Sequence, residues 1–125
     1  MSLQAKSLRT FIGSNQFNVS RAFYRDVGFE ESVVSDQLSY FEMEGVGFCL
    51  QRYYVEDWVN NSMMFLEVAD LDAAYRKIEA MQLPSKYPGV RLQPIQDDDW
   101  GREFFLHDPA GVLWHIGTFA SDDSS

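Results

Sequence analysis

Two stretches of the chain follow the same order of predicted elements, which is one strand, one helix and then three strands. The two helices carry related segments, Ala22–Arg25 in the first and Ala73–Arg76 in the second. A unit of about 50 residues that occurs twice is the signature of an internal repeat. Units at about residues 8–54 and 62–119 predict a single α+β domain over residues 1–120, followed by a flexible acidic tail at 121–125.

Apolar spacing and turn residues set the predicted limits of these elements. The first helix ends at Gly28, and the second has Asp70 as a candidate N-cap and ends at Leu83-Pro84. One helix per unit covers only one face of a small sheet, so the other faces must curve around a cleft, pack on a second subunit, or both. The predicted strands cover residues 10–12, 29–34, 38–43, 46–53, 62–68, 90–95, 102–106 and 112–119.

The segment Asp108–Gly111 between the last two predicted strands is a strong turn signal. Proline at the second position presets φ, aspartate at the first bonds back to nearby backbone, and the final glycine tolerates positive φ. The resulting hairpin carries Trp100, Arg102 and His115 toward whatever the sheet encloses.

Charge and cysteine content exclude several classes of partner. The net charge is −9, with 19 acidic and 10 basic residues, which argues against nucleic acid or anionic lipid and permits a cationic ligand. No apolar run approaches the ~20 residues of a membrane span, and no signal peptide is recognised. The single Cys49 excludes an internal disulfide. We therefore expect a cytoplasmic protein without nucleic-acid or membrane partners.

The repeated unit and its motifs resemble the vicinal oxygen chelate superfamily, which includes glyoxalase I, extradiol dioxygenases, fosfomycin resistance enzymes and bleomycin resistance proteins. The segments that carry the resemblance are Phe23–Phe29, Val68–Asp72 and Asp108–Ile116. It implies two βαβββ units that form a curved mixed sheet around a cleft. Trp100–Phe104 and His115 are most similar to the bleomycin resistance proteins, which sequester the drug without a metal in clefts between the subunits of a dimer.

Enzymes of this superfamily place a metal ion on four inward-facing side chains. The matching places hold Arg9, Gln51 (Leu50 if the register shifts by one), Met63 and His115. A guanidinium cannot be a ligand, a thioether suits the metals of this group poorly, and such sites need three or more good ligands. We therefore expect no metal, no cofactor and no catalytic residue.

The resemblance also implies a ligand-binding set. Trp100 would stack on a planar ligand, Leu38 replaces the second stacking aromatic, with Tyr40 nearby, and Asn60 replaces an acid. Strand alternation places Met63, Phe65 and Glu67 inward, with Arg9 as the natural partner of that carboxylate, and places His115 inward as a ligand donor or a satisfied core histidine. Arg102 either binds an anionic group or pairs with Glu103 or Asp99. The full predicted set is Arg9, Leu38, Tyr40, Gln51, Asn60, Met63, Phe65, Glu67, Trp100, Arg102, Phe104 and His115.

These observations predict a homodimer that binds a small molecule, sequestering an aromatic or cationic compound as in antibiotic resistance, without a metal. One alternative is a glyoxalase-like lyase or dioxygenase-like metalloenzyme that uses His115 and Gln51, or a metal-free acid–base reaction at Glu67 and His115. A further alternative is a structural or regulatory dimer without a ligand.

Overall fold

The first half of the chain forms a four-stranded sheet with one helix. A computed structural model describes residues 2–120, and the predicted tail at 121–125 lies outside them. The strands run in the order β1-β4-β3-β2, with β1 parallel to β4 and the other neighbours antiparallel. The elements are β1 (Phe11–Gly13), α1 (Phe17–Val27), β2 (Glu30–Ser35), β3 (Leu38–Met43) and β4 (Val46–Gln51).

The second half forms a five-stranded sheet in the order β5-β9-β8-β6, with β7 also paired to β8. As in the first half, the strand that precedes the helix is parallel to the last strand of the unit. The elements are α2 (Glu56–Asn60), β5 (Met63–Glu67), α3 (Leu71–Ala80), α4 (Leu83–Lys86), β6 (Arg91–Leu92), β7 (Gln96–Asp98), β8 (Gly101–His107) and β9 (Leu113–Phe119). The α+β class is confirmed, whereas the second half differs from the predicted order of one helix and three strands in having α4 and a fourth strand after the helices.

Three local predictions need correction. The connection between the units contains the short helix α2. Pro84 does not end the second helix: α3 stops at Ala80, and Pro84 lies in the first turn of α4, where its missing N–H costs nothing. The predicted strand at 90–95 is reduced to β6 at Arg91–Leu92, and pairing with β8 resumes in β7 only after Pro94, which cannot donate a ladder hydrogen bond. None of the helices described over residues 2–120 is long and apolar enough to cross a membrane.

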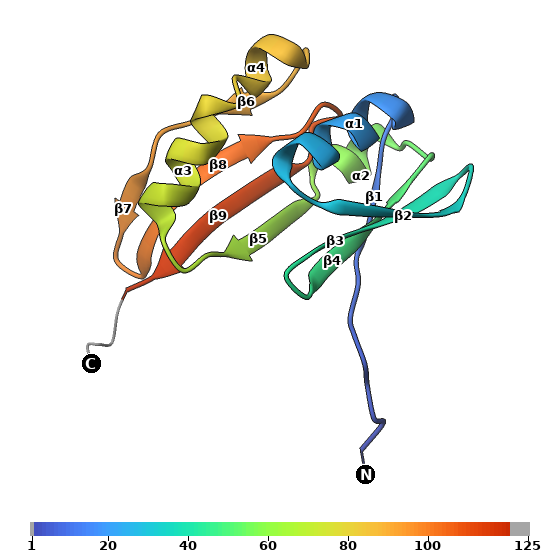
Figure 1. The fold of residues 1–125 in the computed structure, drawn as a ribbon, viewed down its shortest axis with the longest axis horizontal. Coiled ribbons are helices and arrows are strands. Elements are labelled where there is room, and N and C mark those ends of the chain that lie inside the picture. Colours follow the sequence, from blue (N-terminus) through green and yellow to red (C-terminus); the bar gives the residue numbers. More distant parts are fainter. Residues whose placement is uncertain (1, 121–125) are drawn as a thin grey trace.

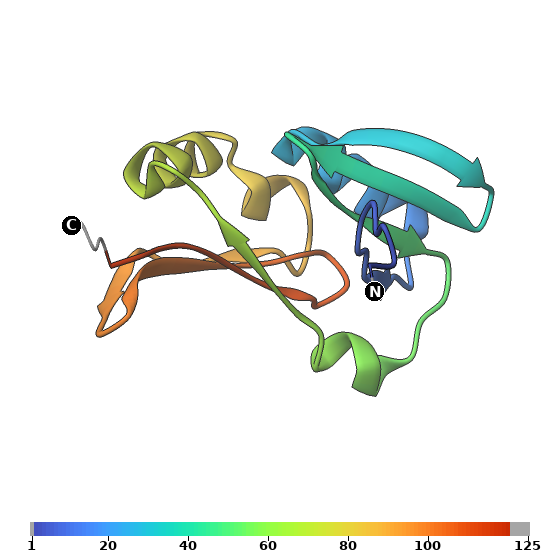
Figure 2. The same ribbon diagram turned by 90° about the horizontal axis from the view of Figure 1, so that it is seen from below.

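Each main helix packs on one face of its own sheet (Figure 1). Seen from below, α3 lies on one side of the β8–β9 ribbon, and α2 reaches the other side only at the end next to Gly111 (Figure 2). Alternation along β8 and β9 therefore divides their side chains. Phe104 on β8 and Trp114 and Ile116 on β9 are buried on the helix-covered face. The opposite face, which we call the open face of the second sheet, carries the side chains that alternate with these along β8 and β9.

The hydroxyl of Tyr24 on α1 joins the two halves. It donates to Asp108 Oδ2 at 2.6 Å and accepts from Trp114 Nε1 at 2.9 Å. The other carboxylate oxygen, Asp108 Oδ1, accepts the N–H groups of the three residues that follow Pro109, as the turn motif predicts. Burial raises the pKa of Asp108, although the hydrogen bonds that its carboxylate accepts act to lower it. Burial, together with the neighbouring carboxylate of Asp108, raises the pKa of Tyr24 well above its usual value.

Removing this hydroxyl leaves two buried polar groups without a partner. We expect Tyr24→Phe to lower the free energy of unfolding by about 1–3 kcal/mol, because Asp108 Oδ2 and Trp114 Nε1 each lose a hydrogen bond in the core. Urea denaturation followed by circular dichroism measures the loss. Tyr53→Phe is the matched control, since Tyr53 is half exposed and has no hydroxyl hydrogen bond within residues 2–120. Equal losses for the two variants would contradict the role given to Tyr24.

The division of faces is tested by two phenylalanines. Phe104→Ala removes a fully buried ring that packs on Tyr75 of α3 with centroids 5.1 Å apart, and we expect a loss of about 3–5 kcal/mol. Phe65→Ala removes an exposed ring from the open face, with an expected loss of about 1 kcal/mol or less. The free energy of unfolding in urea separates the two variants. A larger loss for Phe65→Ala than for Phe104→Ala would reverse the assignment.

Candidate ligand-binding site

The open face of the second sheet is built in rows across three strands. Cross-strand partners lie on the same face, so each row follows from the register of β5, β9 and β8. One row is Phe65, His115 and Phe105, and its neighbour is Glu67, Gly117 and Glu103. The missing side chain of Gly117 leaves space that the ring of Phe65 fills, since a Cβ there would lie 3.2 Å from that ring.

Three aromatic rings gather at one end of the open face. Trp100, Phe65 and Phe119 are mutual neighbours, with centroids 5.3–5.8 Å apart and tilted or edge-on planes. Their exposed fractions are 38%, 44% and 53%, although aromatic rings of this size are usually buried. Together with Glu103 and His115 they line a cavity of about 370 Å³. This cavity is the candidate binding site, and we call the three rings the aromatic cluster.

A carboxylate and an imidazole form the floor of this cavity. Glu103 Oε1 lies 2.8 Å from His115 Nδ1, and the side chains are 8% and 24% exposed. Phe105 packs edge-on against the imidazole at 5.0 Å. A carboxylate can only accept, so Nδ1 carries the proton of this hydrogen bond. The Nε2 of the same ring is buried and has no partner within residues 2–120.

The structure places five of the predicted site residues on the open face. Trp100 lines the cavity. Met63, Phe65 and Glu67 lie on β5, and His115 lies on β9 at the centre of the sheet. Glu103 was missed as a site residue, although counting alternate residues outward from the Asp108–Gly111 turn places it on the same face as His115.

Two predicted residues lie on the wrong face. Phe104 is buried against α3 and cannot touch a ligand on the open face. Arg102 also points to the helix side, where it pairs with Asp72 and Asp97 at 3.1 Å, and its expected pairing with Glu103 or Asp99 is wrong. Both errors have one cause, because adjacent strand residues point to opposite faces and only one of each adjacent pair reaches the site.

The remaining predicted residues lie outside the aromatic cavity. Arg9 does not pair with Glu67, because its guanidinium stacks on the ring of Tyr40 at 3.9 Å. Gln51 on β4 lies directly opposite Leu38 on β3, also in the first sheet. The last member, Asn60, ends α2 and lines a second cavity with Met63. The predicted set therefore occupies two separate sheets of one chain.

The donor set does not fit a divalent metal ion. No group of three or more His, Cys, Asp or Glu side chains that could hold one occurs within residues 2–120. The four superfamily positions supply a guanidinium on Arg9, an amide on Gln51, a thioether on Met63 and an imidazole on His115. Glu103 already occupies the Nδ1 of that imidazole. These four side chains therefore do not form a binding site for a divalent metal ion.

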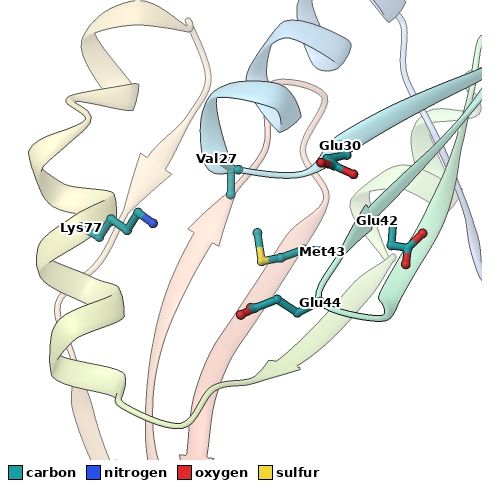
Figure 3. A pocket seen from close by; sticks show the side chains of 7 residues that line it. Val27, Glu30, Glu42, Met43, Glu44 and Lys77 are labelled. Carbon is teal, nitrogen blue, oxygen red and sulfur yellow. The ribbon is translucent and has the colours of Figure 1, made fainter.

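A third cavity opens on the helix side, between α3 and the turn that joins β3 to β4 (Figure 3). It has a volume of about 460 Å³, and no aromatic ring lines it. Glu30, Glu42 and Glu44 line it with Met43, and Lys77 reaches toward it from α3 (Figure 3). None of the predicted site residues lies here, so it is not the candidate site.

Comparison with known proteins gives a match in structure alone. No protein-family model and no curated protein sequence matches the chain. A bleomycin-binding protein from the bleomycin producer Streptomyces verticillus, complexed with copper(II)-bleomycin, is 19% identical with a TM-score of 0.76 over 94% of this chain and all of that one. A bleomycin resistance determinant encoded on the transposon Tn5 is 18% identical with a TM-score of 0.78, over 91% and 98%.

Fosfomycin resistance protein FosX from Listeria monocytogenes, complexed with Mn(II) and sulfate, is 16% identical with a TM-score of 0.70, over 98% of this chain and 95% of that one. The similarity thus extends over nearly the whole chain, in proteins that differ in what they bind. The chain has the fold shared by the bleomycin resistance and fosfomycin resistance proteins, as its sequence motifs predict.

Proposed function

We propose that this protein reversibly binds a small aromatic or cationic molecule on the open face of the second sheet, without a metal ion and without changing it chemically. The observation that carries this proposal is the aromatic cluster of Trp100, Phe65 and Phe119, exposed around the largely buried carboxylate of Glu103. Sequestration of this kind needs affinity only, and no bond-making group.

The chemistry of the cavity selects the ligand. Exposed indole and phenyl faces gain contact area and stacking energy when a planar ligand covers them, and each ring pair contributes about 0.5–1.5 kcal/mol beyond burial. A cation is favoured by these π-faces and by Glu103, while the net charge of −9 attracts it from solution.

Two structural neighbours support a drug as ligand. One neighbour is bleomycin-binding and one is a bleomycin resistance determinant. Two members of the aromatic cluster, Trp100 and Phe119, belong to the hairpin that carries the sequence resemblance to the bleomycin resistance proteins, and Phe65 on β5 completes the cluster. An antibiotic-resistance role by sequestration is the proposal these observations favour.

We further propose that the binding protein is a homodimer. The open face is a single wall, whereas small-molecule sites usually enclose most of the ligand surface. Tyr40, Leu38 and Gln51 form a second predicted wall on the first sheet. These residues in a second copy would close the cavity, which explains why the predicted set is divided between two sheets of one chain.

One observation favours a second candidate function. A largely buried carboxylate bonded to an imidazole, as in Glu103 and His115, is an arrangement that enzymes use for general acid–base chemistry. A glyoxalase-like lyase or dioxygenase-like enzyme would use this pair on a substrate, with a metal in the superfamily's usual chemistry. Metal analysis of the purified protein tests this candidate: stoichiometric, tightly bound zinc, nickel, manganese or iron would overturn the metal-free proposal.

The binding proposal is tested with thioflavin T, a planar aromatic cation, and with metal-free bleomycin. We expect at least one of the two to raise the melting temperature by mass action, and Trp100→Ala to weaken its affinity about tenfold or more, since a large stacking face is lost. Fluorescence titration measures the affinity. Trp58→Ala is the matched control, because Trp58 is an exposed indole on α2 that does not line the aromatic cavity. An equal effect of the two substitutions, or no binding of either probe, would refute the proposal.

The dimer proposal is tested by sedimentation velocity over a range of concentrations. We expect a species of twice the chain mass, and we expect Met63→Glu to shift it toward the single chain, because the new carboxylate lies on the open face. Ala73→Glu adds the same charge to the exposed side of α3 and serves as the control. A monomer at all concentrations, or equal dissociation by both variants, would contradict the dimer.

A further inference from the structure

The end of the open face opposite the aromatic cluster has a different chemistry. Its row consists of Met63 on β5, Leu113 on β9, His107 on β8 and Arg91 on β6, each directly opposite the next. A cavity of about 410 Å³ lies over this row, and the amide residues Asn60 and Asn61 border it. Except for Met63 and Asn60, these residues were not among the predicted site residues.

The cavity offers cationic and neutral donors without a carboxylate. Arg91 is exposed and makes no ion pair within residues 2–120. No acidic side chain is among the residues that line the cavity. In a chain with 19 acidic residues against 10 basic ones, an unpaired guanidinium in a cavity free of carboxylates is a local reversal of the overall charge. The planar guanidinium of Arg91 presents a fork of N–H groups whose geometry matches a carboxylate, phosphate or sulfate.

His107 adds a second donor to the cavity. Its Nδ1 is buried without a partner within residues 2–120. Since a buried N–H without an acceptor is rarer than a bare acceptor, the favoured neutral tautomer keeps its proton on Nε2, the nitrogen that is not buried. Burial, together with the positive charge of Arg91, also lowers the pKa of His107. A neutral ring thus presents one N–H beside a guanidinium.

We propose that this cavity binds the oxyanion of an elongated ligand, with the carboxylate, phosphate or sulfate on Arg91 and His107 and the apolar body extending along Phe105 and Leu113 toward Trp100. The inference rests on the proposed function in placing one ligand along the whole face. Glu103 and His107 lie four residues apart on β8, so the two ends are separated by about 14 Å. The ligand therefore carries an aromatic or cationic group at one end and an anionic group at the other.

Two probes with the same alkyl chain and opposite charge test this inference, dodecanoate and dodecyltrimethylammonium, both below their micelle concentrations. We expect isothermal titration calorimetry to show that Arg91→Gln weakens dodecanoate binding about tenfold or more, through loss of a charge-assisted hydrogen bond, and leaves dodecyltrimethylammonium binding unchanged. The control is Arg76→Gln, which removes an exposed arginine from α3 on the other side of the sheet. No binding of dodecanoate, an equal effect of Arg91→Gln on both probes, or equal losses of dodecanoate affinity in both variants would overturn the inference.

A second measurement reports on the cavity itself. The proton resonances of the His107 imidazole, followed by NMR over a pH series, give its pKa with and without dodecanoate. Bound carboxylate next to the ring should raise the pKa, because an anion favours the charged imidazolium. An unchanged pKa at saturating dodecanoate would place the probe elsewhere. If a second copy covers Arg91, dodecanoate does not bind, which also overturns the inference.

The two ends of the face are tested independently. If neither thioflavin T nor bleomycin binds but dodecanoate binds in an Arg91-dependent manner, the proposed aromatic ligand is refuted and the oxyanion cavity is retained. Trp100-dependent binding of an aromatic probe without Arg91-dependent binding of dodecanoate overturns only the inference about the anion.

Discussion

The buried hydroxyl of Tyr24 is the interaction on which the rest of the structure depends. It is the point where α1 of the first half meets the Asp108 turn and Trp114 of the second. A buried hydroxyl needs partners, and both of its partners lie on the last hairpin. Because Asp108 also accepts three backbone N–H groups of its own turn, one carboxylate determines both where the hairpin turns and which half it packs against.

The Asp108–Gly111 turn also determines which side chains lie on the open face. From Leu113 outward on β9 and from His107 back on β8, alternate residues face away from the helices. A shift of one residue would exchange the buried Phe104 and Trp114 for Glu103 and His115. The cost of packing a carboxylate and an imidazole against the helices in place of two aromatic rings makes the register specific. The site chemistry and the core are therefore two results of the same register.

Sequence alone predicts most elements and the turn, whereas it assigns some candidate site residues to the face that α3 covers. The repeated order and the Asp108–Gly111 turn depend on local chemistry, which a sequence displays directly. Phe104 and Arg102 were assigned to the site because they belong to a motif shared with the bleomycin resistance proteins, although alternation sends them to the helix side. The expected pairing of Arg9 with Glu67 needs two separate sheets to meet, and no local pattern reports the distance between sheets.

The open face carries Glu103 at one end and Arg91 at the other, and this opposition of charge is itself a selection device. Glu103 and Arg91 have opposite charge, yet about 14 Å of strand separates their ends of the face, beyond the screening length of about 8 Å at physiological salt. They therefore cannot neutralise each other across the face, and each retains its field for a ligand. A molecule with one charged end binds in either half, whereas a dipolar molecule of matching length satisfies both ends in one orientation only. Orientation is thus specified by two residues that never touch.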